Sequence, residues 1–429
     1  MNAANRIKSL LEEGQLTARI CAVYGCDPAH AVKHGDRFSK AAQAFDNQFP
    51  SSGEASFFTA PGRTEIGGNH TDHQHGHVLA GSVDLDVIAV AAPNRDGLIR
   101  IKSEGYPADI IDVMSLTVHD EEINQSASLI RGIAARFAEL GYPVSGFDAY
   151  TTSNVLSGSG LSSSAAFEVL IGNIINTFFA GGKEDVISIA QIGQYAENVY
   201  YQKPCGLMDQ MASSVGGIIT IDFKSTKNPV VEKVDYDFAH SGYALVIIDS
   251  GADHGDLTGE YAAIPAEMQA AAAVFGQKVL RDVDPQLFYG NIHMVWEKAG
   301  DRAALRAMHF FEEDRRVSEE VAALRAGDFD GFKQLIIASG RSSCMYLQNV
   351  FASSKPQEQA VSIVLALCER LLAGKGAWRV HGGGFAGTVQ AFVPVSDTAS
   401  FKEIIEAYIG KNKCHILNIR PVGGTCLWK

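Results

Sequence analysis

The feature that most constrains this 429-residue sequence is a strand-like stretch, a glycine–serine loop and a long apolar helix in succession between residues 146 and 180. Residues 146–153 are typical of a strand and Ala165–Ala180 of a helix. The loop reads LSGSGLSSSAA from Leu156 to Ala166. Glycines permit close backbone approach, and the free N–H groups at a helix start favour an anion. This order therefore predicts a phosphate-binding loop.

The loop belongs to neither of two common nucleotide-binding patterns. A Walker loop would end in Gly-Lys-Ser/Thr, which is missing here, and Ser163 takes the place of the third glycine in the dinucleotide pattern. The alternative is a helix capped by serine with a flexible approach.

Glycines gather in two further places among the 42 in the chain. The first is PGRTEIGGNHTDHQHG, from Pro61 to Gly76, which we predict to be a tight loop between two strand-like stretches. Because polar side chains on such a loop suit a core poorly, the segment favours a polar-ligand site, with a solvated loop as the alternative. A metal site also stays open, although the spacing of its candidate ligands fits no recognised zinc pattern. Those candidates are His70, Asp72, His73, His75 and His77.

The other glycine cluster is GGGFAG at Gly382–Gly387. It matches the letters of a dinucleotide fingerprint, but residues 388–395 are typical of a strand where that fingerprint needs a helix. We therefore interpret it as a turn that lets a ligand or another backbone come close.

A carboxylate stands out in the segment ENVYYQKPCGLMDQMAS, which runs from Glu197 to Ser213. Asp209 lies there in a weakly charged, mostly apolar setting. A partly buried carboxylate needs a partner, so Asp209 is a candidate functional group. A helix-capping aspartate is the alternative.

Composition excludes several classes of protein. The chain is 46% hydrophobic and 20% charged, which is typical of a folded, water-soluble protein. Its 36 Lys and Arg against 49 Asp and Glu give a net charge of −13, which argues against nucleic-acid and membrane partners. No signal sequence or bilayer-spanning stretch is visible, and the seven cysteines form no CxxC pair. We expect a cytoplasmic protein with reduced thiols.

The pattern along the chain predicts an α+β protein. Residues 1–50 form a helical arm, residues 51–225 a first domain with the phosphate loop, and residues 240–429 a second α+β domain. The polar segment 224–239 is the best boundary between the two domains. Within them we expect strands at 56–60, 98–103, 108–112 and 243–249, and helices at 126–139, 294–308 and 317–325.

The four segments together resemble the GHMP small-molecule kinases, and specifically the galactokinases. The shared pattern is an early PGR…HTD loop, a middle GLSSSAA loop, a CGLMDQ segment and a late GGGF.G turn. It extends from about Phe38 to near the C-terminus and leaves the first 35 or so residues uncovered. The resemblance implies a two-domain GHMP kinase fold with a ribosomal S5-like N-terminal domain and an active-site cleft between the domains.

The same resemblance implies roles for individual residues. Asp209 would accept the proton of the anomeric hydroxyl, and Arg63 would pair with it and stabilise charge on the transferred phosphoryl group. Ser164 and Glu197 would be the Mg²⁺ ligands, and Gly383 and Gly384 would back the site. The sugar would be contacted by Asn69, His70, Asp72, Gly206 and Tyr261. ATP would be wrapped by Ser157, Gly158, Ser159, Gly160, Leu161, Ser162, Ser163, Ser164 and Ala165.

Two departures from the family pattern concern the sugar. Family members usually read GEHTDYN where this chain reads GNHTDHQ, so that Asn69 replaces a glutamate near the C6 hydroxyl and His73 replaces a tyrosine. An amide still donates and accepts hydrogen bonds. The expected activity is therefore ATP-dependent phosphorylation of galactose to galactose 1-phosphate.

Other functions stay open at this point. One is a kinase for galacturonate, N-acetylgalactosamine or arabinose, since the lost negative charge would relax exclusion of a C6 carboxylate. Another is a non-catalytic sensor of galactose and ATP, and a third is a metal-dependent hydrolase built on the histidines. We expect a small-molecule sugar and ATP as the partners, with a monomer favoured.

Overall fold

The computed structural model describes residues 2–156, 160–252 and 257–429, and it is built on two sheets. The larger has eight strands in the order β12-β1-β2-β5-β3-β4, with β6 paired to β2 and β7 paired to β6. Only β3 and β5 pair in parallel, whereas the other neighbours are antiparallel. The bounds of its strands are β1 Ser56–Gly67, β2 His77–Pro93, β3 Leu98–Ser103, β4 Ala108–Asp112, β5 Phe147–Ser153, β6 Ile218–Asp222, β7 Val230–Val234 and β12 Thr425–Trp428.

The central strands of this sheet are buried on both faces. Successive side chains of a strand point to opposite faces, so the apolar run 87–92 serves two cores. Ala89 and Ala91 belong to the core under the helices α4 (Ser126–Glu139) and α5 (Ser163–Phe179). Ile88 and Val90 instead pack in the core formed with the N-terminal helices.

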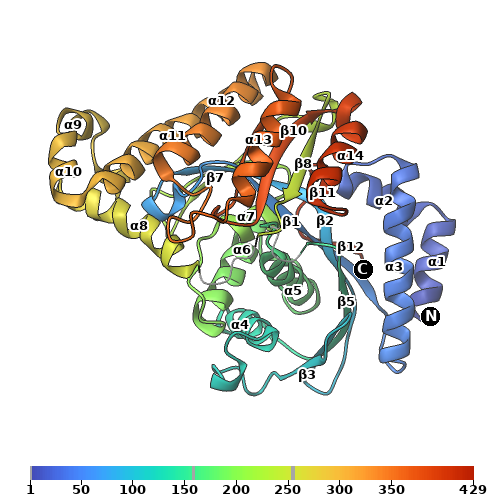
Figure 1. Cartoon of the computed structure of the whole chain (residues 1–429). Coiled ribbons are helices and arrows are strands. Elements are labelled where there is room, and N and C mark those ends of the chain that lie inside the picture. The colour runs from blue at the N-terminus through green and yellow to red at the C-terminus, as the bar shows by residue number, and fades with distance from the viewer. Residues whose placement is uncertain (1, 157–159, 253–256) are drawn as a thin grey trace.

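Those N-terminal helices are α1 (Ala3–Glu12), α2 (Gln15–Tyr24) and α3 (Pro28–Gln48), and they lie together at one end of the molecule (Figure 1). Asp86 of β2 anchors them. It is fully buried, Arg37 of α3 donates to it at 2.6 Å, and Tyr24 of α2 also donates to it. Arg420, near the C-terminus, donates to the same carboxylate at 3.2 Å. A buried charge with these partners ties the arm to the sheet.

The smaller sheet has four antiparallel strands in the order β11-β8-β10-β9. Their bounds are β8 Tyr243–Asp249, β9 Ala377–His381, β10 Thr388–Pro394 and β11 Cys414–Leu417. Helices α13 (Ala360–Leu372) and α14 (Thr398–Ile409) pack on one face. Helices α11 (Asp301–Arg325) and α12 (Phe329–Ser342) lie between the two sheets. One continuous core there includes residues of both sheets, such as Leu79 of β2 and Phe392 of β10.

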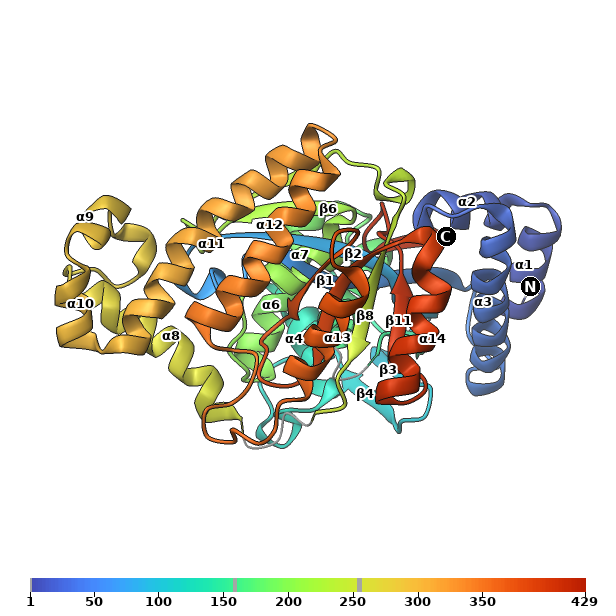
Figure 2. The same ribbon diagram turned by 45° about the horizontal axis from the view of Figure 1, so that its top comes forward.

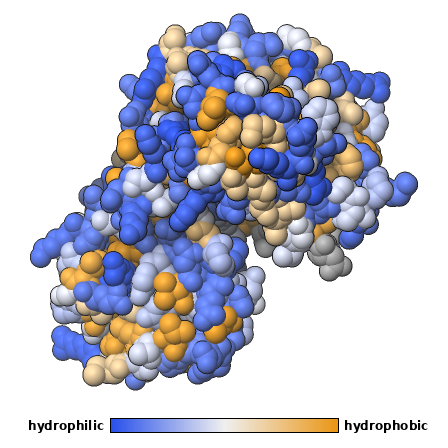
Figure 3. All heavy atoms as spheres, turned by 90° about the vertical axis from the view of Figure 1, so that its left-hand side faces the viewer, coloured by the Kyte–Doolittle hydropathy of each residue, from blue (hydrophilic) through white to orange (hydrophobic). Residues whose placement is uncertain are grey.

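Three peripheral helices, α8 (Thr258–Ala273), α9 (Pro285–Gly290) and α10 (Ile292–Ala299), form the end of the molecule opposite the N-terminal helices (Figure 2). Seen from their side, the surface narrows between two lobes of unequal size (Figure 3). On the far side of the first sheet from the N-terminal helices lie α6 (Val186–Tyr195), a π-helical turn at Ala196–Tyr200 and α7 (Met208–Val215).

The structure corrects three expectations from the sequence. The predicted loop at 61–76 is strand as far as Gly67, and all twelve residues of β1 are buried. The predicted helix at 294–308 ends at Ala299, and α11 then runs unbroken through the charged stretch that separated it from 317–325. Helices α12 and α14 and strands β11 and β12 were not expected.

The predicted domain boundary at residues 224–239 does not separate the two sheets cleanly. Strand β7, at 230–234, still belongs to the larger sheet, and so does β12 at the end of the chain. The second half of the chain therefore returns to the first sheet. Among the residues that the structure describes, none of the helices is both long and apolar enough to cross a bilayer.

Candidate active site

Arg63 and Asp209 form the centre of the site. Arg63 follows a register shift between Pro61 and Arg63 on β1, an irregularity of the kind that redirects side chains. Asp209 lies in the first turn of α7, where the helix dipole favours a negative charge. The Arg63 Nε donates to Asp209 Oδ1 at 2.7 Å, and Nη2 lies 2.6 Å from the same oxygen. The predicted pair is therefore present.

The phosphate loop is joined to this pair. Ser162 Oγ donates to Asp209 Oδ2 at 2.6 Å, and Arg63 Nη1 donates to the carbonyl of Gly160. Ser162 precedes α5 in the left-handed region, with φ +57°, and its side chain bonds to Asp209 and makes no capping hydrogen bond to the helix. The expected ATP contacts Ser157, Gly158 and Ser159 lie outside the described residues.

Three cavities meet around Asp209 and the start of α5. One of about 190 Å³ and one of about 270 Å³ share Arg63, Cys205 and Asp209 in their walls. The second cavity shares Ser163 and Ser164 with a third of about 580 Å³. The three cavities thus form a continuous series, with the Arg63–Asp209 pair at the first junction and the start of α5 at the second.

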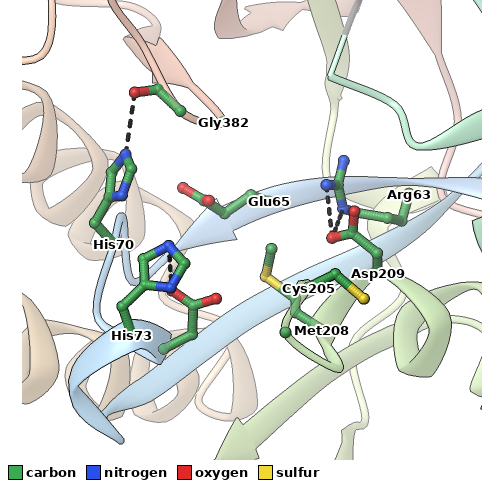
Figure 4. Close-up of a pocket in the computed structure, with 11 residues that line it drawn as sticks. Arg63, Glu65, His70, His73, Cys205, Met208, Asp209 and Gly382 are labelled. Atoms are coloured by element: carbon green, nitrogen blue, oxygen red, sulfur yellow. Dashed lines mark hydrogen bonds and ion pairs between the residues drawn. The ribbon is translucent and has the colours of Figure 1, made fainter. Parts of the chain in front are cut away.

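The smallest cavity has polar walls drawn from both halves of the chain (Figure 4). Of the predicted sugar contacts, His70, Asp72 and Gly206 line it, and so does Gly383 from the late glycine turn. A Cβ at position 206 would lie 3.0 Å from Asp72 Oδ2, so the glycine leaves room for the carboxylate. The cavity is also lined by Cys205 and Met208, for which the sequence suggested no site role. Two more lining residues come from the early polar segment, namely Glu65, which had no role of its own there, and His73, which was a candidate metal ligand.

His70 is held in its neutral form. Burial lowers its pKa to about 4, and the neighbouring His73 acts in the same direction. Its Nε2 lies 3.0 Å from the Gly383 carbonyl oxygen, so this nitrogen carries the proton and donates it. The other ring nitrogen is then an acceptor in the wall of the cavity.

Asn69 does not line the cavity. It is fully buried, and its Nδ2 donates to Glu65 Oε1 at 2.9 Å and to the Gly382 carbonyl at 2.7 Å. Its Oδ1 accepts from Asn349 at 2.8 Å and from Ser343 at 3.3 Å. Both donors and both acceptor positions of the amide are therefore used within the protein.

Tyr261 also lies behind the cavity wall. Its hydroxyl donates to the Gly384 carbonyl at 2.9 Å, and its ring packs edge-on against Phe385, with centroids 5.2 Å apart. A Cβ at Gly383 would lie 2.7 Å from the Tyr261 ring. The tyrosine thus supports the glycine turn, and the turn needs glycine for this close approach.

The middle cavity combines anion and cation partners. Ser162, Ser163 and Ser164 line it at the start of α5, opposite Glu197 and Lys203. Lys203 Nζ lies 3.1 Å from Glu197 Oε1, and its side chain is 61% exposed. Free backbone N–H groups and a lysine suit a phosphate chain. The phosphate loop itself contains no lysine. Lys203 instead reaches this cavity from the turn before α7.

A second carboxylate lies behind Glu197. Gln210 Nε2 donates to Glu197 Oε2 at 2.8 Å and to Glu168 Oε2 at 2.9 Å. Burial and the charge of Glu197 hold the pKa of Glu168 well above its usual range. The two carboxylates therefore share one amide donor behind the wall of the middle cavity.

The largest cavity has a mixed wall. Val87, Leu129 and Phe167 supply apolar surface, whereas Glu104 and Thr151 supply polar groups. An apolar site with a few polar groups is typical of the ring of a cofactor or nucleoside. This cavity was not foreseen, since its walls come from strands and helices far apart in the sequence.

The histidines of the early segment do not form a metal site. Over residues 2–156, 160–252 and 257–429, no group of three or more His, Cys, Asp or Glu side chains is placed to hold an ion. His77 instead pairs with Asp314, at 3.0 Å, and with Asp222, at 3.3 Å.

Sequence comparison decides the family. The chain is 32% identical over 379 residues to the galactokinase of Actinobacillus pleuropneumoniae serotype 5b, covering 85% of this chain and 92% of that protein. The chain belongs to the galactokinase family. It is also 29% identical to the galactokinase of Streptomyces coelicolor, over 81% of this chain and 87% of the relative.

Two family profiles match parts of this galactokinase-family chain. The profile described as GHMP kinases N terminal domain covers residues 128–217, which contain α5 and Asp209. The profile described as galactokinase galactose-binding signature covers residues 43–93, which contain Arg63 and Asp72. The two matches meet in space at the Arg63–Asp209 pair.

Solved structures bear out the fold. Lactococcus lactis galactokinase complexed with galactose superposes with a TM-score of 0.74 at 23% identity, covering 89% of this chain and 98% of that one. A mevalonate kinase superposes with a TM-score of 0.59 at 14% identity, covering 84% and 99%. The expected α+β GHMP kinase fold is therefore confirmed.

Proposed function

We propose that this protein transfers the γ-phosphoryl group of ATP to the anomeric oxygen of galactose, giving galactose 1-phosphate and ADP. The observation that carries the proposal is the position of the Arg63–Asp209 pair in the walls of both smaller cavities. A sugar in the first cavity and a triphosphate in the second would meet at this pair. The family relationship supports the same activity.

The reaction follows from the positions of these groups. Asp209 accepts the proton of the anomeric hydroxyl while the anomeric oxygen of the sugar forms a bond to the γ-phosphorus. The bond from that phosphorus to the β,γ-bridging oxygen breaks, and ADP leaves. Ser162 holds the second carboxylate oxygen of Asp209. The Arg63 guanidinium stabilises negative charge that develops on the transferred group.

The ATP site takes its parts from the other two cavities. Gly160 through Ala165 would wrap the phosphates at the start of α5, and the largest cavity would hold the base and ribose. Lys203 adds a positive charge next to the phosphates. An enzyme that consumes ATP works where ATP is supplied, so we place it in the cytoplasm.

The residues present fit a Mg²⁺ ion. Ser164 and Glu197 supply a hydroxyl and a carboxylate to the cavity that would hold the phosphates, and Mg²⁺ prefers one or two protein oxygens together with phosphate oxygens. A bound Mg²⁺ would neutralise charge on the phosphate chain. Lys203 Nζ lies 3.1 Å from Glu197 Oε1, so the lysine and the metal ion would share this carboxylate.

For the sugar, we propose that His70, Asp72 and the backbone at Gly206 make direct contacts. Asn69 and Tyr261 would act through the residues they support, because their polar atoms are bonded to the protein. This revises the direct sugar contacts that the family resemblance implied for both.

A sugar panel tests the proposal. Purified protein with ATP and MgCl₂ is assayed with galactose, galacturonate, N-acetylgalactosamine and arabinose, and the product is identified by ³¹P NMR as an anomeric phosphate. The highest kcat/KM is expected with galactose. A higher kcat/KM with another sugar would refute the substrate, and binding of galactose and ATP without turnover would indicate a sensor.

A further inference from the structure

Glu65 places a carboxylate in the sugar cavity at a position for which neither the sequence nor the proposed mechanism supplied a role. Its side chain is only 8% exposed, and it reaches the cavity from β1, two residues after Arg63. In Figure 4 it lies between His70 and Arg63, on the cavity side of the strand.

One oxygen of Glu65 is fully used by the protein. Oε1 accepts from Arg379 Nη2 at 2.7 Å and from Asn69 Nδ2 at 2.9 Å. Among the described residues, none donates a hydrogen bond to Oε2, and this atom is not among those sealed from solvent. Oε2 is therefore an acceptor left for whatever occupies the cavity.

The carboxylate is held firmly in this orientation. Arg379 is fully buried, and it also donates to the Ile66 carbonyl at 2.6 Å and to the Val380 carbonyl at 3.0 Å. Asn69 is fixed by its own four hydrogen bonds, so neither partner of Glu65 can follow a ligand without breaking other bonds. Burial raises the pKa of Glu65, whereas the Arg379 guanidinium acts in the opposite direction and favours the ionised form.

Among the described residues that line the cavity, there is no lysine, and the arginine, Arg63, is paired with Asp209. The acidic side chains of the lining are Glu65, Asp72 and Asp209, and His73 lies beside Asp72, with its Nε2 3.7 Å from Oδ1. His70 is neutral because its pKa is about 4. A ligand carboxylate near Glu65 would therefore meet like charge without compensation.

We propose that Glu65 is a specificity-determining residue, whose free Oε2 accepts a hydrogen bond from a sugar hydroxyl and whose charge excludes uronic acids. The inference rests on the proposed sugar kinase activity. Glu65 also compensates for the glutamate that the family pattern has at position 69. In this chain the residue at that position, Asn69, orients Glu65, and the carboxylate is supplied by Glu65, two residues after Arg63.

The test combines one variant with altered sugars. Glu65→Gln keeps the size of the side chain and removes its charge, and we expect kcat/KM for galactose to fall about 10- to 100-fold, mainly through KM, because a hydrogen bond to a charged group is lost. The fall should shrink at least about fivefold on one of the four deoxygalactoses that keep the anomeric hydroxyl, namely the one that lacks the partner hydroxyl. The ratio of kcat/KM for galactose to kcat/KM for galacturonate should become smaller in Glu65→Gln than in the wild type.

Controls separate this role from a structural one. Glu232→Gln makes the same chemical change on the exposed strand β7, beside Arg325 and outside the three cavities, and should leave all ratios unchanged. Glu65→Asp keeps the charge but withdraws the oxygen, so it should raise KM for galactose and still reject galacturonate. If Glu65→Gln does not fold, as judged by circular dichroism, Glu65→Asp carries the test with the same deoxysugars.

The outcomes are distinct. Equal losses on galactose and on all the deoxysugars, unchanged discrimination against galacturonate, or a wild type that prefers galacturonate would each overturn the role of Glu65. If the wild type turns over none of the sugars, the proposed function fails by itself. The same comparison is then made on sugar binding by isothermal titration calorimetry, where loss of the galactose-over-galacturonate preference in Glu65→Gln still supports the role.

Discussion

Arg63 and Asp209 lie 146 positions apart in the chain, yet two nitrogens of one guanidinium lie 2.7 and 2.6 Å from a single carboxylate oxygen. The other oxygen accepts from Ser162, so both oxygens of the carboxylate are held by hydrogen bonds. As the proposed general base, a carboxylate held in this way would need little reorganisation on accepting a proton.

Asp209→Asn should abolish most of the activity while sugar binding persists. The amide cannot accept the proton, and a positioned general base contributes about 10²- to 10⁴-fold, so we expect kcat to fall by at least that much. Steady-state kinetics and calorimetric titration with galactose measure the two effects. Asp36→Asn, on the exposed face of α3, is the matched control and should behave as wild type. A kcat near that of wild type would show that Asp209 is not the base.

Ser162 allows its hydrogen bond to be separated from its backbone conformation. Ser162→Ala and Ser162→Gly both remove the bond to Asp209, and each should lower kcat about 10-fold. Only glycine suits the left-handed backbone at φ +57°, so the glycine variant should melt at a higher temperature than the alanine variant. If kcat instead follows the melting temperature, backbone strain and not the hydrogen bond governs activity.

Lys203→Met should weaken the binding of ATP more than the binding of the sugar. Because the lysine side chain is 61% exposed, its charge is partly screened, and we expect KM for ATP to rise about 2- to 10-fold with little change in KM for galactose. The difference from wild type should shrink as KCl is added. Lys224→Met, at an exposed position after β6, is the control. A rise in KM for galactose without a rise in KM for ATP would show that Lys203 contributes to sugar binding and not to ATP binding.

Glu320 should make the protein less stable at high pH. Both of its oxygens are buried without a hydrogen-bond partner among the described residues, and burial, with Glu313 nearby, holds its pKa well above the usual range. The folded state therefore binds a proton that the unfolded state releases above its ordinary pKa of about 4.5. Its contribution to stability is full below that pH and is lost as pH rises toward the folded pKa.

Glu320→Gln, which cannot ionise, removes this loss. Urea unfolding of wild type and variant between pH 5 and pH 9 measures it, and the variant should gain relative stability as pH rises. Glu319→Gln, one residue earlier, is the control, since its half-buried carboxylate has an ion-pair partner in Arg315. Parallel stability curves for wild type and Glu320→Gln would mean that Glu320 is already ionised in the folded protein.

Local patterns in the sequence predicted many elements well. Helix 126–139 and strands 98–103, 108–112 and 243–249 coincide with α4, β3, β4 and β8. These segments have clear periodicity or are bounded by turn residues. Strand β1 was cut short at 60 because it is buried on both faces and carries arginine and glutamate, so that alternation between polar and apolar residues is lost.

The extent of helix α11 was predicted wrongly for a related reason. Its charged residues Glu313, Arg316 and Glu320 are buried between the two sheets, which no hydrophobic pattern can indicate. Burial of Arg316 and Glu313 is tolerated because they pair with each other, and that pairing exists only in the folded helix.

By itself, the sequence determined the inventory of the site: a phosphate loop before a long helix, an arginine in an early glycine-rich segment and a carboxylate in a weakly charged segment. Only the tertiary structure decided which side chains face the ligand. Asn69 is withdrawn by Asn349 and Glu65 is turned outward by Arg379, partners 280 and 314 residues away. Hydrogen-bond capacity is finite, so the direction of a polar side chain depends on the partners that folding brings to it.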